Sequence, residues 1–82
     1  MPEYFIVTIS DGRFEIDLEI PSRLPFTAFK EKLLEILKNA GGHEFLNYRD
    51  YRLVFGNHSL RGGDTLASVG AFDGSLLSVR KV

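Results

Sequence analysis

The chain contains no cysteine, and this absence excludes several kinds of chemistry. Without a thiol there is no disulfide bond, no cysteine nucleophile, and no cysteine-ligated zinc or iron–sulfur cluster. The lack of cysteine is compatible with a reducing compartment. No apolar run approaches the roughly 20 residues that a membrane helix requires. The start, Met1-Pro2-Glu3, lacks the basic residues of a signal peptide, so we expect a cytoplasmic protein with no direct membrane insertion.

A surplus of positive charge is missing as well. The 82 residues include 10 basic and 11 acidic ones, for a net charge of −1, whereas a nucleic-acid-binding domain usually carries a clear basic excess on one face. We therefore expect protein partners and no nucleic acid. The length predicts a single domain over residues 1–82, and it does not indicate an oligomeric state.

Two alternating runs near the N-terminus predict a β-hairpin. Phe14, Ile16, Leu18 and Ile20 alternate with acidic residues, which is the pattern of a half-buried strand. Asp11-Gly12 between the runs favours a two-residue turn with positive φ at both positions. Such a turn would give one buried face with the following pairs: Ile9 with Phe14, Val7 with Ile16, and Phe5 with Leu18. The other face would carry Tyr4, Ile6 and Thr8.

A long amphipathic helix follows the hairpin. Pro25 suits a first helical position, and Thr27 is a competing N-cap. The helix would end near the glycines at 41–42, after about 14 to 16 residues. Its apolar positions recur at helical spacing: Phe26, Phe29, Leu33, Leu37 and Ala40.

The second half of the chain reads as short strands. Residues 51–55 alternate with Leu53 and Phe55 inward, residues 58–60 form a short strand, and residues 76–79 form the last one. Leu66 and Val69 lie on a brief helical turn. One helix must bury its apolar stripe against one sheet face, so this order predicts an α+β fold of the β-grasp type, with a mixed four- to five-stranded sheet packed on one long helix.

The stretch RLVFGNHSLRGGDTLASVGAFDGSLLSV, residues 52–79, resembles the second half of ubiquitin without a gap. Its ending, TLASVGAFDGSLLSV, is most similar to the small bacterial ubiquitin-like proteins of the YukD type. These proteins accompany type VII secretion systems and end without Gly-Gly. The resemblance implies a non-catalytic interaction module, an accessory or regulatory component of such a system. Because the sequence ends in Arg80-Lys81-Val82, the resemblance also implies that it is not conjugated.

Ubiquitin binds partners through an apolar patch on its open sheet face, and the resemblance places a changed version of that patch here. Val54 keeps the apolar character of ubiquitin's central isoleucine, while Arg80 replaces a valine and Ser78 a histidine. The face is either an ordinary solvated surface or a docking site for a different protein. The residues expected to bind a protein partner are Ile6, Thr8, Arg52, Val54, Ser78 and Arg80. Of these, Ile6 is expected to lie beside Val54.

Other interpretations remain open at this point. The stretch 43–50 is an insertion relative to ubiquitin, and its Phe45, Leu46 and Tyr48 could form the binding surface instead. Ubiquitin-like folds also occur as small subunits of multicomponent oxygenases and as conjugated modifiers.

An enzyme is not expected. His43 and His58 are the only histidines; either could pair with Glu44 or Asp64, but no nucleophile accompanies them. We therefore assign no catalytic residue, no metal ligand and no cofactor. Tyr48 and Tyr51 near Arg49 could stack on bases, although packing beside the helix explains them better.

Overall fold

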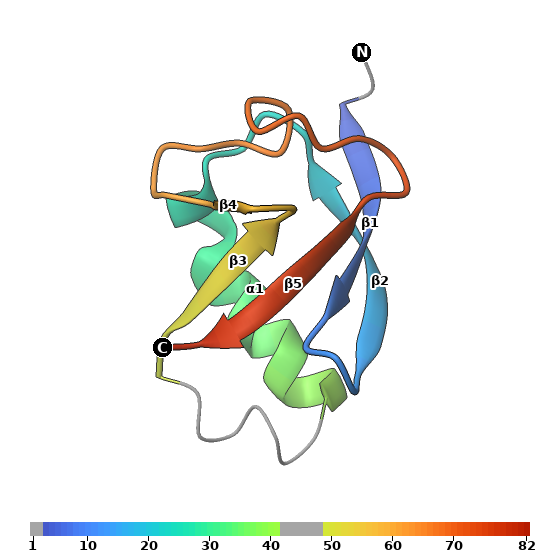
Figure 1. Cartoon of the computed structure of the whole chain (residues 1–82), viewed down its shortest axis with the longest axis vertical. Helices are drawn as coiled ribbons and strands as arrows, with labels where there is room; N and C mark the ends of the chain where they lie inside the picture. The colour runs from blue at the N-terminus through green and yellow to red at the C-terminus, as the bar shows by residue number, and fades with distance from the viewer. Residues whose placement is uncertain (1–2, 42–48) are drawn as a thin grey trace.

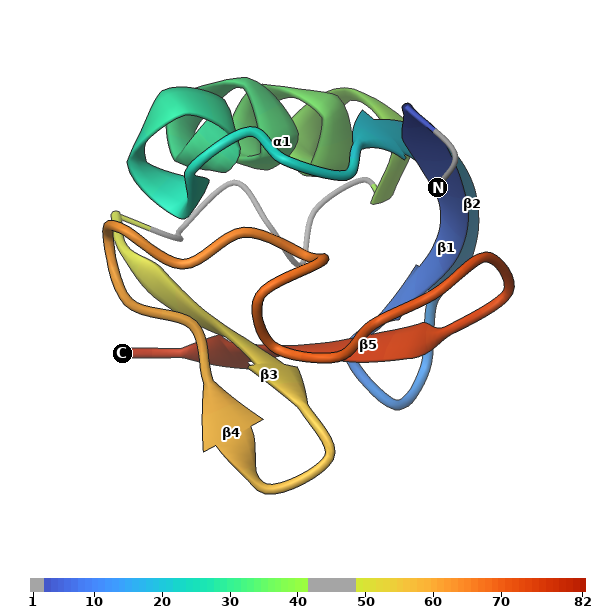
Figure 2. The ribbon, with the colours of Figure 1, turned by 90° about the horizontal axis from the view of Figure 1, so that it is seen from above.

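The computed structural model describes residues 3–41 and 49–82, and these form one sheet and one helix (Figure 1). The five strands have the order β2-β1-β5-β3-β4, in which β1 and β5 are parallel and the other neighbours antiparallel. The helix lies across one face of the sheet (Figure 2). The predicted β-grasp arrangement is confirmed. The elements are β1 (Tyr4–Ser10), β2 (Glu15–Pro21), α1 (Phe26–Gly41), β3 (Tyr51–Phe55), β4 (His58–Ser59) and β5 (Leu76–Lys81).

The predicted register of the first hairpin is wrong by two residues. Ile9 pairs with Ile16 and not with Phe14, and the same shift holds along the hairpin, so that Val7 pairs with Leu18 and Phe5 with Ile20. The cause is the side chain of Asp11, whose Oδ1 accepts the N–H groups of Arg13 at 2.9 Å and Phe14 at 2.8 Å. This local bonding, typical of aspartate in turns, holds a longer connection with positive φ at Gly12 but not at Asp11. A shift of two keeps every side chain on its predicted face.

The apolar stripe of α1 is confirmed except at its end. Phe26, Phe29, Leu33 and Leu37 are buried against the sheet, whereas Ala40 is exposed. Leu37, which is fully buried, is the last residue of the helix that belongs to the core. The helix also meets β3, where the buried Tyr51 donates its hydroxyl to the C=O of Lys30 at 2.6 Å. Tyr51 is therefore a packing residue, as expected.

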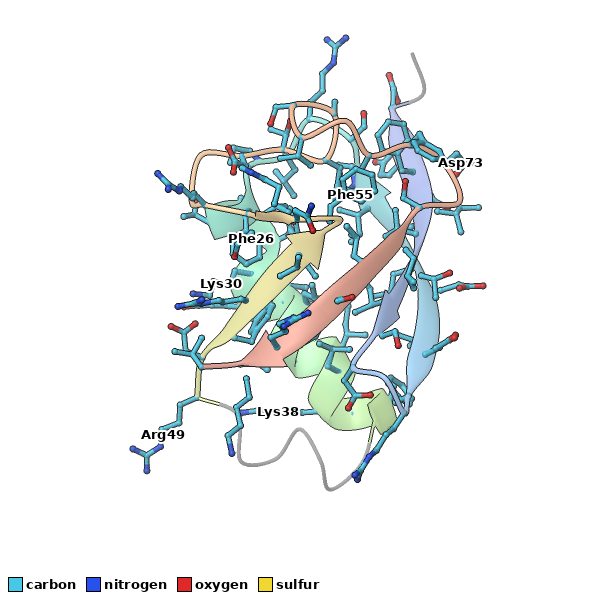
Figure 3. All side chains as sticks on the ribbon, in the orientation of Figure 1. Phe26, Lys30, Lys38, Arg49, Phe55 and Asp73 are labelled. Atoms are coloured by element: carbon cyan, nitrogen blue, oxygen red, sulfur yellow. The ribbon has the colours of Figure 1, made fainter. Side chains whose placement is uncertain are left out.

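Lys30 also joins α1 to the start of β3 through its charged side chain. Its Nζ lies 2.6 Å from Oδ1 of Asp50 and sits over the rings of Phe26 and Tyr51, 5.7 and 5.9 Å from their centroids; Figure 3 labels Phe26 and Lys30. The hydrogen bond from Lys30 lowers the pKa of the Asp50 carboxyl, with a further contribution from the N–H of Tyr51. Burial raises the pKa of the Tyr51 hydroxyl, so it stays a proton donor.

The start of α1 is capped by a distant loop and not by its own sequence. Pro25 directly precedes the helix and Thr27 lies inside its first turn, so neither takes the position predicted for it. The N–H of Phe26 donates to the C=O of Asp64 at 2.7 Å, and the N–H of Thr27 donates to the C=O of Gly62 at 3.1 Å. These bonds satisfy donors that a helix start leaves without intrahelical partners. The loop before β5 is thereby fixed to the helix.

The C-terminal half follows the prediction closely. Leu53 and Leu66 are fully buried, and Phe55 is half-buried against the core. The N–H of Val69 donates to the C=O of Thr65 at 3.2 Å, which is the predicted single helical turn. Strand β5 is longer than expected and continues to Lys81.

Substituting Leu37 tests the helix packing. Leu37→Ala should lower the free energy of unfolding by roughly 2–5 kcal/mol, because a fully buried leucine leaves a cavity. Urea denaturation followed by circular dichroism measures the loss. Glu35→Ala on the exposed side of α1 is the control and should change stability by less than about 0.5 kcal/mol. Equal effects of the two substitutions would contradict the packing of α1.

Gly62 is needed because of a close approach, not because of its backbone angle. A Cβ at Gly62 would lie 2.8 Å from Cγ2 of Thr27, whereas one at Gly63 would meet nothing within 4 Å; neither residue has positive φ. Oγ1 of Thr27 donates to the C=O of Gly62 at 3.0 Å, which fixes the rotamer and holds the methyl group in place. Gly62→Ala should therefore destabilise by roughly 1–3 kcal/mol, and Gly63→Ala should not.

The same contact predicts a rescue. Thr27→Ser removes the methyl group and keeps the hydroxyl donor, so Gly62→Ala should cost little in a Thr27→Ser background. A double-mutant cycle of denaturation midpoints measures the coupling. An undiminished cost of Gly62→Ala in that background would refute the steric explanation.

Candidate functional site

The six candidate residues all lie on the sheet face opposite α1. Their strand neighbours Val7, Leu53 and Leu77 point to the helix and are fully buried, so alternation turns the candidates outward. Ile6, Arg52 and Arg80 are exposed, and the remaining three are partly exposed. The three central strands each contribute: β1 gives Ile6 and Thr8, β5 gives Ser78 and Arg80, and β3 gives Arg52 and Val54.

The strand register brings some of these residues together. Arg52 lies directly opposite Arg80, and Val54 lies opposite Ser78. Ile6 and Val54 are not neighbours, because β5 runs between β1 and β3. The expectation that Ile6 is a neighbour of Val54 is therefore wrong. It failed because adjacency across a sheet depends on strand order, which the pattern of each strand does not contain.

Leu76 is a third apolar residue of the outer face, on the strand between those of Ile6 and Val54, and the sequence interpretation missed it. It pairs laterally with Thr8 on β1 and lies two residues before Ser78, the partner of Val54. Its side chain is 56% exposed, and that of Ile6 is 51% exposed. Leu76 is thus within diagonal reach of Val54. Strand parity could have found it, because Val79 points inward and Leu76 must then point outward. We call Ile6, Val54 and Leu76 the apolar patch.

A tight turn before β5 fixes the part of β1 that carries Ile6, a residue of the apolar patch. The N–H of Ile6 donates to Oδ1 of Asp73 at 2.7 Å, and the C=O of Ile6 accepts the N–H of Gly74 at 2.7 Å. Figure 3 shows Asp73 beside β1, at the end of the sheet where β5 begins. The N–H of Ser75 donates to the C=O of Phe72 at 3.0 Å, and Gly74 has a φ of +94°, a combination typical of a turn that requires glycine. The backbone that presents Ile6 is therefore well ordered by hydrogen bonds.

The positive charges at the other end of the face are not neutralised within the described part of the chain. Arg52 and Arg80 oppose each other across β3 and β5, and no salt bridge joins either one to a carboxylate of residues 3–41 or 49–82. Like charges directly opposite each other on a sheet destabilise it. The pair therefore favours contact with an anionic or hydrogen-bond-accepting group.

The histidine–carboxylate pairing has a structural explanation. Nε2 of His58 lies 3.0 Å from Oδ2 of Asp64, which also accepts the N–H of Arg61 at 2.9 Å. The Arg61 N–H, followed by the His58 contact, lowers the pKa of the Asp64 carboxyl. These bonds order the same loop that caps α1. His43 and Glu44 lie outside the described residues, within which no three histidine or carboxylate side chains gather as metal ligands.

Of the 43–50 insertion, the other candidate binding surface, residues 49 and 50 belong to the described part of the chain. Within the insertion 43–50, Phe45, Leu46 and Tyr48 lie outside the described residues. Asp50 is described, and its bond to Lys30 fixes the chain where β3 begins.

None of the helices described in residues 3–41 and 49–82 is long and apolar enough to cross a membrane.

Comparison with known proteins gives a consistent result. The family model described as "WXG100 protein secretion system (Wss), protein YukD" matches residues 4–79. No curated protein sequence is significantly similar to the chain. Among solved structures, the ubiquitin-like domain of the Mycobacterium tuberculosis type VII secretion system protein ECCD1 is similar, with a TM-score of 0.78 and 25% identity over 95% of this chain and 98% of that one.

Two further structures share the fold. The EccD5 ubiquitin-like domain from Mycobacterium xenopi has a TM-score of 0.81 and 19% identity over 99% of this chain and 97% of that one. A chain of the MycP5-free ESX-5 inner membrane complex has a TM-score of 0.77 and 20% identity; the match covers 99% of this chain but 21% of that one. The same fold therefore occurs both as a separately solved domain and as a small part of a much longer chain.

Proposed function

Because the chain belongs to the YukD family of the WXG100 protein secretion system, we propose that it is a non-catalytic protein-interaction module of a bacterial type VII secretion system. Residues 1–82 act as a single ubiquitin-like domain. Its place is the cytoplasm, and its role is that of an accessory or regulatory component. It works by docking to another protein.

The observation that carries this proposal is the family match over residues 4–79, supported by the likeness to a type VII secretion domain at 25% identity. The match favours secretion over the oxygenase and modifier interpretations. The fold of one chain in the ESX-5 inner membrane complex supports a partner within a secretion assembly.

The docking surface we propose is the open sheet face. The apolar patch provides a small hydrophobic centre, and Thr8 and Ser78 supply hydrogen-bonding groups beside it. Arg52 and Arg80 add a positive end. An apolar centre bordered by polar groups and arginine is the usual composition of a binding hot spot.

A double substitution tests this surface. Val54→Asp with Arg80→Glu should reduce capture of secretion-system proteins from a native lysate by at least about tenfold, equivalent to ~1.4 kcal/mol. Both side chains lie on the outer face, so circular dichroism and thermal melting should show a folded protein. Mass spectrometry with quantified peptides measures the capture.

The control carries the same change of charge elsewhere. Asn57→Asp with Arg23→Glu alters two exposed loop residues and should leave capture unchanged. If the folded Val54 and Arg80 variant still captures the same proteins, the sheet face is not the site and the 43–50 insertion becomes the candidate. If the unmodified chain captures no secretion-system protein, the proposed function itself fails.

A further inference from the structure

Strand β2 is an edge of the sheet, and its inner side is not fully covered. The inward residues of β1, Val7 and Ile9, are completely buried, whereas Ile16 and Leu18 opposite them on β2 are only partly buried. The helix lies above the sheet, with β2 at one side (Figure 2). Apolar surface therefore remains open between the edge strand and α1.

This opening is a groove of about 210 Å³ between β2 and α1. A cavity of about 150 Å³ is large enough to bind benzene, so the groove has room for a large apolar side chain. Glu19 and Lys32 are the charged residues along it. Its apolar lining consists mainly of Leu18, Ile20, Leu24, Phe29, Leu33 and Ile36.

The edge of β2 also offers main-chain hydrogen-bonding groups. The N–H of Ser22 donates to the C=O of Glu3 at 2.8 Å, and the N–H of Asp11 donates to the C=O of Phe14 at 3.2 Å. These bonds bracket the β1–β2 ladder, in which hydrogen-bonded pairs alternate with pairs that are not bonded. Within the described chain β2 pairs only with β1. The residues whose N–H and C=O groups point away from β1 are Glu15, Asp17 and Glu19.

The side chains of these same three residues form an acidic row on the open face. On the neighbouring strand β1, the residues opposite this acidic row carry no charge; they are Ser10, Thr8 and Ile6. Asp17 accepts a hydrogen bond from Thr8 at 2.7 Å. No salt bridge engages any of the three carboxylates within residues 3–41 and 49–82. The row therefore stays negative along the whole edge.

We propose that the edge of β2 and the groove beside it bind an extended segment of a partner protein in which apolar residues alternate with lysine or arginine. The segment adds a strand to the sheet through main-chain hydrogen bonds at Asp17 and Glu19. Because strand side chains alternate between faces, its apolar residues enter the groove and its basic residues lie beside the acidic row.

The negative charge of the acidic row favours a basic partner strand over a second copy of the chain. Two β2 edges paired together would bring two acidic rows against each other, and like charges opposite each other destabilise a sheet. A basic strand gains from the same row. Pro21 ends the edge because it has no N–H, so the site is limited to the length of β2.

The probe is a short acetylated peptide in which valine and lysine alternate. In NMR titration of the full chain, the largest shifts should occur at the amides of Asp17 and Glu19 and at the methyl groups of Leu24 and Ile36. Two control peptides should bind at least about tenfold more weakly: one with the same composition in two blocks, and one with glutamate in place of lysine.

A charge exchange provides the matched variant. Glu15→Lys with Glu19→Lys changes two exposed side chains. It should lower the affinity for the valine–lysine peptide by about tenfold, because each cross-strand pair changes from attraction to repulsion. The same variant should come to prefer the glutamate peptide. Equal binding of the block peptide, shifts confined to the apolar patch, or no shift at millimolar peptide would each overturn the proposal.

The proposal rests on the protein-binding role but uses a different surface, so the two can fail separately. If the valine–lysine peptide binds β2 and the chain captures no secretion-system protein, the edge site stands and the secretion role does not. If Val54→Asp with Arg80→Glu abolishes capture and the peptide does not bind β2, the sheet face stands and the edge site does not.

Discussion

A sheet of five strands with a single helix can be covered on one face only, and the surfaces of this protein follow from that constraint. Helix α1 needs the inner face to bury Phe29, Leu33 and Leu37. The outer face is therefore left to solvent, and there Ile6 and Leu76 remain more than half exposed. Because the helix crosses the sheet, it also leaves β2 incompletely covered. Both proposed binding surfaces are consequences of the single helix in the described part of the chain.

The position of the helix depends in turn on contacts from far along the chain. The carbonyl groups of Gly62 and Asp64 accept the first N–H groups of α1, and Tyr51 and Asp50 hold Lys30 at the next turn. These contacts come from β3 and from the loop before β5. The helix is thus aligned by the half of the chain that also builds the open face, so the packing of α1 and the shape of that face are coupled.

Sequence patterns predicted the helix, the strands and the inward or outward direction of the side chains, because these depend on local periodicity. They did not predict the hairpin register, which the Asp11 side chain sets. They also placed Ile6 beside Val54, because the insertion of β5 between β1 and β3 is a long-range property. The sequence patterns did not predict the groove for the same reason. It is formed between β2 and α1, so it depends on how these two elements pack and not on the pattern of either one.

The outer face is divided by charge, and the division separates the two proposed partners. The row of Glu15, Asp17 and Glu19 lies on the edge strand, whereas Arg52 and Arg80 lie on β3 and β5 with β1 between the two regions. A basic strand that binds β2 is repelled by the arginines, and an acidic partner of the arginines is repelled by β2. Specificity is a difference of affinities and is often built from such repulsion. The charge of each proposed surface therefore disfavours the partner proposed for the other.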